Sequence, residues 1–261
     1  MIGIFDSGLG GLTAVKEIVE IMPNEDIVYF GDTGRVPYGG RDKETIIKYS
    51  KQDVRFLLSK KVRAVLIACG TASTNAIDEL RCEFDIPIVG VVDAVTKKAC
   101  SVTKNKKIGV IGTAATIKTG EYELRIHELL PDAQCYSKPC PLFVPLVENG
   151  FINEDNEITR LTVEYYLKEL REYGIDTLIL GCTHYPIIAP IIAKVMPGVT
   201  LINSGREAAK AIADSIGVIS SESGEVSYYV SDDGKSFREN ASVFMQQKID
   251  KQVQTIDIDA Y

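Results

Sequence analysis

The sequence lacks a long apolar run, an excess of basic residues and any closely spaced pair of cysteines. Its longest apolar stretches, residues 64–69 and 187–195, fall well short of the roughly 20 residues that a membrane-spanning helix needs. Acidic side chains outnumber basic ones by 36 to 29, and no local basic run rises above the level of residues 104–107. These absences argue against a membrane protein and against a protein that grips nucleic acid through its phosphates.

The chain has six cysteines but no basic region followed by an apolar stretch at its start. We therefore expect no export signal and a cytoplasmic protein, in which the thiols are reduced rather than joined in disulfides. Cys182 and His184 form a Cys-x-His pair, which is a poor template for zinc without a second close pair of ligands. We expect no bound metal, so the thiols are candidates for packing or for catalysis.

Apolar clusters alternate with longer segments of helical period, which is typical of an α/β protein with parallel strands. Apolar residues recur with the clearest helical spacing in residues 12–21 and 43–58. The chain is long enough for two domains of ordinary size, and we expect two. The predicted strands are residues 1–5, 26–30, 64–68, 88–91, 107–111, 177–180, 199–202, 227–230 and 254–257.

Two segments of the chain recur in a similar form. Residues 2–8 resemble residues 108–113, and residues 65–71 resemble residues 178–183. The repetition indicates two related halves, each with one cysteine, Cys69 or Cys182, directly after a buried strand. A chance likeness is the alternative, because many apolar strands are followed by a Gly or Thr turn.

Polar or reactive residues follow four of the predicted strands. In open parallel sheets the ligand lies beyond the carboxyl ends of the strands, so chemistry is expected at these positions. They are residues 6–7, 69–71, 113–116 and 182–186. Within and beside them, neutral hydroxyl donors come from Ser7, Thr71, Thr113, Thr116 and Thr183. Such a site is suited to a small acidic molecule held without a cluster of arginines.

Cys69 and Cys182 are the strongest candidates for chemistry. We expect one helix to begin near Ser73 and another near Pro186, so that each thiol faces the positive end of a helix. That position would lower a thiol pKa from about 8.5 toward 7, and two such thiols can act as base and acid. The other cysteines are predicted to be packing residues; they are Cys82, Cys100, Cys135 and Cys140.

Three further features surround these candidates. His184 shares the turn of Cys182 and is expected to orient or protonate a reacting group. The glycine-rich turn at residues 8–11 lacks the spacing of a dinucleotide site, since Thr13 stands where the third glycine belongs; we expect it to face an anion through backbone N–H groups. Residues 31–40 are interpreted either as a wall over the ligand, lined by Tyr38 and Gly39, or as a plain surface loop.

These motifs together closely resemble the glutamate racemases of the aspartate/glutamate racemase superfamily. The matching segments are residues 6–11, 31–39, 68–72, 112–116 and 181–186. The resemblance implies two similar, doubly wound α/β domains with mostly parallel sheets and pseudo-symmetry, with the active site in the cleft between them. We expect the first domain at residues 1–93 plus 208–261 and the second at residues 94–207.

The resemblance also implies an activity: cofactor-independent interconversion of L- and D-glutamate by a homodimer, which supplies D-glutamate for peptidoglycan. It implies that Cys69 and Cys182 are acid/base thiols on opposite faces of the substrate α-carbon. Asp6 would assist Cys69, and His184 together with Glu148 would assist Cys182. The implied substrate contacts are Asp6, Ser7, Tyr38, Gly39, Gly70, Thr71, Thr113, Thr116, Thr183 and His184.

One residue departs from the family pattern. The family commonly has asparagine after the first cysteine, where this chain has Gly70. The missing amide leaves a backbone contact or a water in its place, so a racemase or decarboxylase acting on another acid is a second hypothesis. His184 favours glutamate, because aspartate racemases of the superfamily usually have Glu at that position. A non-catalytic binder of an acidic metabolite is a third hypothesis, although it gives the two strand-end cysteines no role.

Overall fold

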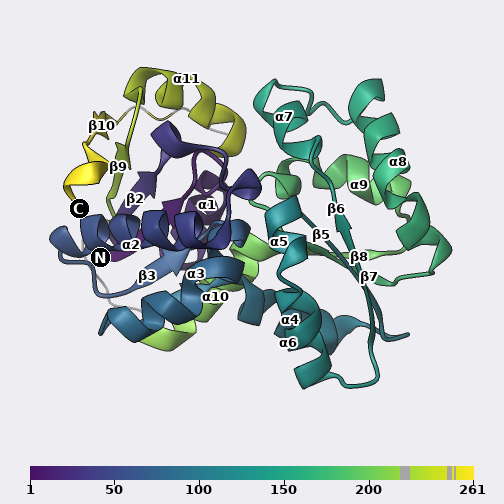
Figure 1. Ribbon diagram of the computed structural model, residues 1–261. Helices are drawn as coiled ribbons and strands as arrows, with labels where there is room; N and C mark the ends of the chain where they lie inside the picture. Colours follow the sequence, from purple (N-terminus) through teal and green to yellow (C-terminus); the bar gives the residue numbers. More distant parts are fainter. Residues whose placement is uncertain (218–223, 246–248, 250) are drawn as a thin grey trace.

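The computed structural model describes residues 1–217, 224–245, 249 and 251–261, and these form two β-sheets (Figure 1). The first sheet has the order β10-β9-β2-β1-β3-β4 and the second β6-β5-β7-β8, with every neighbouring pair parallel. We call the parts that carry these sheets the first and the second half. The strands are β1 (Ile2–Asp6), β2 (Ile27–Gly31), β3 (Val65–Ile67), β4 (Ile88–Gly90), β5 (Lys107–Gly112), β6 (Gln134–Pro139), β7 (Thr177–Leu180), β8 (Thr200–Asn203), β9 (Val226–Val230) and β10 (Val253–Thr255).

Helices connect the strands. The α-helices are α1 (Leu12–Ile21), α2 (Lys43–Ser59), α3 (Gly70–Glu83), α4 (Val91–Val102), α5 (Ala114–Lys118), α6 (Glu121–Leu129), α7 (Phe143–Glu148), α8 (Glu157–Glu172), α9 (Ala189–Val195), α10 (Ser204–Ile216) and α11 (Gly234–Met245). Short 3₁₀ helices are η1 (Thr33–Arg35), η2 (Tyr38–Gly40), η3 (Tyr185–Ile188) and η4 (Ile258–Ala260).

The two halves share a strand order. In the first half β1 lies between β2 and β3, with β4 outside β3; in the second half β5 lies between β6 and β7, with β8 outside β7. The segments that resemble each other in sequence are the equivalent strands, β1 with β5 and β3 with β7. The predicted pseudo-symmetric α/β fold with parallel sheets is confirmed, while the exact domain boundaries stay a prediction.

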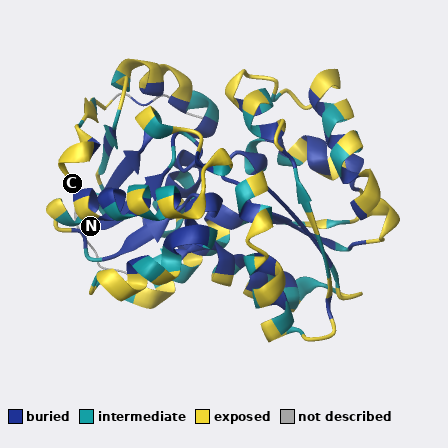
Figure 2. Ribbon diagram, in the orientation of Figure 1, coloured by how far each residue is buried: buried dark blue, intermediate teal, exposed yellow. Residues whose placement is uncertain are grey.

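Helices cover both faces of the first sheet. Because successive side chains of a strand point to opposite faces, Ile4 packs in a core shared with α1 and α10, whereas its neighbour Phe5 packs in a second core with α2 and α3. Figure 2 shows the strands buried between helices whose outer faces are exposed. This layered packing is what makes the sheet doubly wound.

Most predicted strands agree with the structure to within one or two residues, but β6 was not predicted. It is an edge strand, and its sequence, Gln-Cys-Tyr-Ser-Lys-Pro, is exposed or only half-buried throughout. An edge strand needs no continuous apolar run, so the pattern used to find the others was absent. The helix expected near Ser73 begins instead at Gly70.

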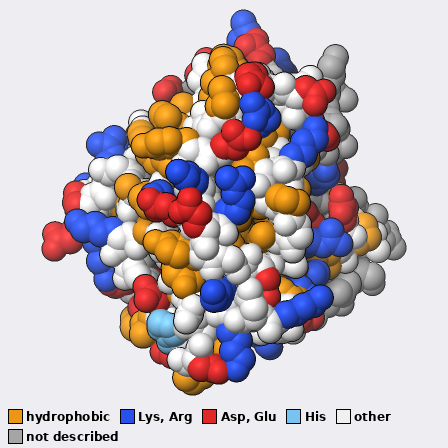
Figure 3. Space-filling model, turned by 90° about the vertical axis from the view of Figure 1, so that its right-hand side faces the viewer, with side chains coloured by type: hydrophobic (Ala, Val, Ile, Leu, Met, Phe, Trp, Pro, Cys, Tyr) orange, Lys and Arg blue, Asp and Glu red, His pale blue; other side chains and the backbone are white. Residues whose placement is uncertain are grey.

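The surface carries apolar side chains interleaved with charges. On the face in Figure 3, hydrophobic side chains lie in patches between Lys, Arg, Asp and Glu. Ile158, Leu161 and Tyr165 are exposed along α8, the same helix that holds Arg160 in ion pairs with Glu157 and Glu164. No helix within the described part of the chain is both long and apolar enough to cross a membrane.

Candidate active site

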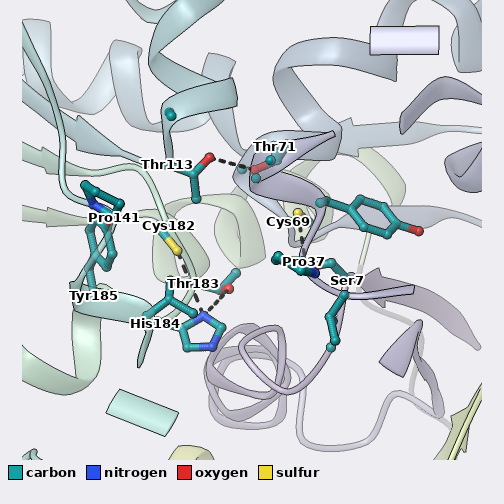
Figure 4. Close-up of a pocket in the computed structure, with 18 of the residues that line it drawn as sticks. Ser7, Pro37, Cys69, Thr71, Thr113, Pro141, Cys182, Thr183, His184 and Tyr185 are labelled. Carbon is teal, nitrogen blue, oxygen red and sulfur yellow. Dashed lines mark hydrogen bonds between the residues drawn. The ribbon is translucent and has the colours of Figure 1, made fainter. Parts of the chain in front are cut away.

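A cavity of about 490 Å³ lies between the two halves. Residues just beyond the ends of parallel strands line it: Ser7 follows β1, and Cys69 and Cys182 lie two positions after the equivalent strands β3 and β7. Figure 4 shows Cys69 and Cys182 on different sides of this cavity, each with its sulfur close to a polar partner. The expectation that chemistry lies at the carboxyl ends of the strands therefore fits the position of the cavity.

Cys69 is the N-cap residue of α3. Its sulfur accepts a hydrogen bond from Ala72 N at 3.5 Å and donates to Ser7 Oγ at 3.7 Å. Burial, reinforced by the nearby charge of Asp6, raises the pKa of Cys69 to about 12. The sequence-based prediction of a lowered pKa is wrong here, because the loss of solvent outweighs the effect of the helix terminus. Cys69 is therefore a neutral thiol in the resting protein.

Cys182 has a different neighbour. Its sulfur lies 3.9 Å from His184 Nδ1, within the turn that leads from β7 to η3. The expected helix near Pro186 is this single 3₁₀ turn, followed by α9 from Ala189. A short turn contributes little helix field, so the group that acts on the Cys182 sulfur is the imidazole of His184 rather than a helix terminus.

His184 joins Cys182 to Glu148. The Nε2 atom lies 3.0 Å from Glu148 Oε1, and the ring is almost fully buried. Burial alone would lower its pKa, but the hydrogen bonds with Cys182 and Glu148 prevail and raise the pKa of His184 to about 10. The ring is consequently protonated at neutral pH, and it places a positive charge beside the Cys182 sulfur.

Asp6 is fully buried behind the cavity rather than in its lining. Its carboxylate accepts hydrogen bonds from Gly8 N at 3.1 Å and from Thr183 Oγ1 at 3.4 Å. Burial raises its pKa, although the charge of His184 and the backbone N–H groups of Gly11 and Gly8 oppose the shift. Asp6 thus ties the turn after β1 in the first half to the turn after β7 in the second.

Three predicted hydroxyl residues form a closed triangle across the two halves. Thr71 Oγ1 lies 3.0 Å from Thr113 Oγ1 and 3.2 Å from Thr116 Oγ1, and the two latter atoms are 2.9 Å apart. Thr71 and Thr113 line the cavity, whereas Thr116 is buried behind it. Only the first two hydroxyls are therefore placed to meet a ligand directly.

The loop before α2 forms one wall of the cavity through Tyr38 and Gly39. The Tyr38 hydroxyl does not point at the ligand space, because it donates a hydrogen bond to Asp32 Oδ2 at 2.5 Å and lies 3.0 Å from Asp53 Oδ2. Arg35 pairs with both carboxylates, at 2.7 Å and 3.1 Å. This buried network fixes the wall, and it leaves Tyr38 a structural contact rather than a free hydroxyl donor.

Around the cavity the structure collects nearly all the residues that the sequence pointed to. The lining includes Ser7, Tyr38, Gly39, Cys69, Gly70, Thr71, Thr113, Glu148, Cys182, Thr183 and His184. Asp6 and Thr116 stand one layer behind. Four lining residues lie outside every segment that the sequence singled out, namely Cys140, Pro141, Val144 and Pro145. They follow the unpredicted strand β6, and the proline-rich composition of residues 139–145 was the available signal.

Cys140 belongs to this segment and lies between the cavity and the protein core. It borders the cavity although its side chain is fully buried, and its sulfur donates to Lys138 O at 3.7 Å. Burial raises its pKa, and its backbone carbonyl accepts a hydrogen bond from Tyr185 OH at 3.0 Å. The predicted packing role of Cys140 is consistent with these contacts.

The described residues include no group of three or more His, Cys, Asp or Glu side chains that could hold a metal ion. The side chains of the site are suited to acid/base chemistry. A buried cysteine lies on each side of the cavity, Cys69 beside the Ser7 hydroxyl and Cys182 beside the His184 imidazolium.

Comparisons with known proteins all point to relatives of one family. The family profile described as Asp/Glu/Hydantoin racemase matches residues 17–212. The chain is 53% identical to the glutamate racemase of Persephonella marina over 208 residues, which cover 80% of this chain and 79% of the relative. It is 45% identical to the glutamate racemase of Aquifex aeolicus over 97% of this chain and 96% of the relative.

A solved structure extends the likeness to three dimensions. The glutamate racemase of Francisella tularensis, crystallised in complex with D-glutamate, superposes with a TM-score of 0.92 at 38% identity, and the match covers 100% of this chain and 98% of that one. Sequence and structure therefore agree on one set of relatives.

Proposed function

The chain belongs to the Asp/Glu/Hydantoin racemase family and is an amino-acid racemase, and from this premise we propose that it interconverts L- and D-glutamate without a cofactor. The observation that carries the proposal is the pair of thiols, Cys69 and Cys182, which reach one cavity from equivalent turns of the two halves. Inversion requires a proton to leave one face of the α-carbon and another to arrive on the opposite face, so two groups facing each other suit the task.

In the proposed cycle the thiolate of one cysteine removes the α-proton. The electron pair left on the α-carbon moves into the substrate carboxylate, and the thiol of the other cysteine delivers its proton to the opposite face. The roles are exchanged in the reverse direction. The protonated ring of His184 would balance the negative charge whenever Cys182 is the thiolate, and the neutral Cys69 thiol would then be the proton donor.

The growing negative charge on the substrate carboxylate also needs partners. Helix α3 begins at Gly70. Two of its first amides already have partners, because Ala72 N donates to the Cys69 sulfur and Ser73 N donates to the Cys69 carbonyl. The amides of Gly70 and Thr71 stand at the positive end of this helix on the cavity side. We propose that they bind the carboxylate, aided by the hydroxyls of Thr71 and Thr113.

From the same relatives and the family resemblance, we propose that the product D-glutamate is used for peptidoglycan in the cytoplasm, and that the enzyme is a homodimer. Glu148 and Asp6 are proposed as assisting groups, Glu148 through its contact with His184 and Asp6 through its charge near Cys69.

The test is incubation of the purified protein with L-glutamate in D2O without added cofactor, following optical activity and loss of the α-proton NMR signal. We expect both to change. Cys69→Ala and Cys182→Ala should each abolish racemisation, while Cys82→Ala, which alters an exposed cysteine, should not. The two-thiol mechanism is wrong if either of the first two variants racemises glutamate at the wild-type rate.

A second candidate function keeps the mechanism and changes the acid. Gly70 provides no side chain to the cavity, so the choice of glutamate rests on the remaining contacts. Aspartate is therefore included as a parallel substrate. Turnover of aspartate with inert glutamate would replace the leading proposal by this one.

A further inference from the structure

The imidazole ring of His184 is held from both halves of the molecule. Its own half supplies the two polar contacts described above, Cys182 Sγ at Nδ1 and Glu148 Oε1 at Nε2. The first half supplies two more contacts. A Cβ atom at Gly10 would lie 2.6 Å from His184 Nδ1, so the backbone of that turn packs directly against the ring. The ring of Phe244 lies 5.2 Å from the imidazole, centroid to centroid, at an interplanar angle of 88°.

Phe244 belongs to α11, a helix of the first half that follows β9 and contacts α1. Figure 1 shows α11 on the first half and α7, which ends at Glu148, on the second half, at the same end of the molecule. The Phe244 side chain is almost fully buried. Its ring is therefore packed where the two halves meet, against a side chain of the opposite half.

The two polar contacts of His184 leave its orientation only weakly fixed. The distance of 3.9 Å to Cys182 Sγ is long even for a hydrogen bond to sulfur, so a small displacement of the ring loses it. The Glu148 side chain is partly exposed and has freedom to move. An aromatic ring packed edge to face at this separation is a favourable contact, and it restricts rotation of the imidazole about its Cβ–Cγ bond.

We propose that Phe244 is a positioning residue, which holds the ring of His184 in the orientation that joins Cys182 to Glu148. For its effect on the rate, this inference rests on the two-thiol function proposed above. Helix α11 would thereby contribute to the chemistry of Cys182 although it does not line the cavity.

The charge of His184 reports its orientation. The groups that act on its protonation are Cys182 and Glu148 of the second half and Asp6 of the first half. The hydrogen bonds with Cys182 and Glu148 raise the pKa of His184 against the effect of burial. If the ring turns away from these partners in a site that stays buried, the pKa of His184 has to fall.

The experiment compares wild type with Phe244→Leu and with a matched control, Phe237→Leu. Phe237 lies on the same helix and is also almost fully buried, but its ring packs against Tyr29 of the first half, at 6.0 Å between centroids. Leucine keeps either position apolar and filled while it removes the aromatic ring. Racemisation of L-glutamate gives kcat and KM, and NMR of the imidazole Cε1 position gives the titration curve of His184.

We expect Phe244→Leu to lower kcat about tenfold, which is part of the 10²–10⁴-fold that an acid/base group typically contributes. KM should stay within about twofold of wild type, because no residue that lines the cavity is altered. The pKa of His184 should fall by roughly half a unit to one unit from about 10. Phe237→Leu should leave kcat and the titration curve as they are in wild type.

A second comparison shows whether Phe244 acts through His184. A His184→Asn variant has no imidazole to position. In that background Phe244→Leu should lower the residual kcat by no more than about twofold, since the effects of two residues that act as one unit are not additive.

The inference is overturned if Phe244→Leu matches Phe237→Leu in both kcat and the titration of His184, or if it costs the full tenfold in the His184→Asn background as well. Should Phe244→Leu fail to fold by circular dichroism, Phe244→Met and Phe237→Met are compared in the same way. If wild type leaves glutamate unchanged, the proposed function itself has failed, and the titration of His184 still tests the positioning role of Phe244.

Discussion

Replacing Glu148 by Gln tests the charge that we assign to the site. The substitution keeps the size and polarity of the side chain but removes the carboxylate that accepts a hydrogen bond from His184 Nε2 at 3.0 Å. Two unit charges about 4 Å apart interact by about 4 kcal/mol at an effective dielectric constant near 20. The Glu148 side chain is 45% exposed, so solvent screening reduces this to about 1 kcal/mol. Since one pKa unit corresponds to about 1.4 kcal/mol, we expect the pKa of His184 to fall by roughly one unit from about 10.

The sign of the stability effect follows from the direction of that shift. The pKa of His184 in the fold lies above its ordinary value of 6.5, so its protonation stabilises the fold fully below pH 6.5, and the contribution is lost as the pH rises through about 10. Wild type and Glu148→Gln should differ by about 1 kcal/mol in free energy of unfolding at neutral pH, and the difference should vanish above about pH 10.

The measurement is simple because the chain contains only two histidines, His127 and His184. Proton–carbon NMR of the imidazole Cε1 positions gives two titration curves, and His127 serves as the internal reference. Glu154→Gln, which alters an exposed carboxylate paired with Lys194, is the control and should leave both curves unchanged. The reasoning is refuted if His184 of wild type titrates near 6.5, or if Glu148→Gln leaves its pKa where it was.

Two further predictions concern the wall of the cavity. Arg35→Ala removes the cation that pairs with the buried side chains of Asp32 and Asp53, and it should lower the free energy of unfolding by about 3–5 kcal/mol in urea denaturation at pH 7. Burial and the charge of Asp32 raise the pKa of Asp53, so the loss should become smaller as the pH falls and Asp53 takes up a proton; a loss that stays constant with pH would contradict the charge argument. Tyr38→Phe removes a hydroxyl that faces those carboxylates rather than the ligand, so we expect a loss of about 1–3 kcal/mol in stability with KM for glutamate unchanged, and a large rise in KM at unchanged stability would show that the hydroxyl serves the substrate.

The sequence allowed prediction of those parts of the fold and site that depend on local pattern. Central strands such as β1 and β7 are continuous apolar runs, and the turn after each run carries Ser7 or Cys182, so both strand and site residue could be found together. Strand β6 was not predicted because it lies at a sheet edge and needs no apolar run. The residues after it, including Cys140, were for that reason not assigned to the cavity.

Properties that depend on distant partners could not be predicted. The direction of the Tyr38 hydroxyl is set by Asp53 on α2, and the pKa of Cys69 is set by burial under elements that the sequence does not bring together. A helix terminus stabilises a thiolate by at most about 2 kcal/mol, and at Cys69 the cost of removing the thiolate from solvent is larger. The close approach of Gly70 to Gly181 likewise exists only once both halves are folded.

The shared strand order of the two halves gives the site a symmetric frame, yet the two thiols have unlike neighbours, Ser7 on one side and His184 on the other. Mirror-image substrates have equal free energies in water, so the Haldane relation requires kcat/KM to be the same in both directions for any enzyme that interconverts them. The unlike surroundings of the two thiols can then give the two enantiomers different kcat values only if their KM values differ by the same factor. An apparent preference for one enantiomer at saturating substrate would reflect how tightly each is held, with the position of equilibrium unchanged.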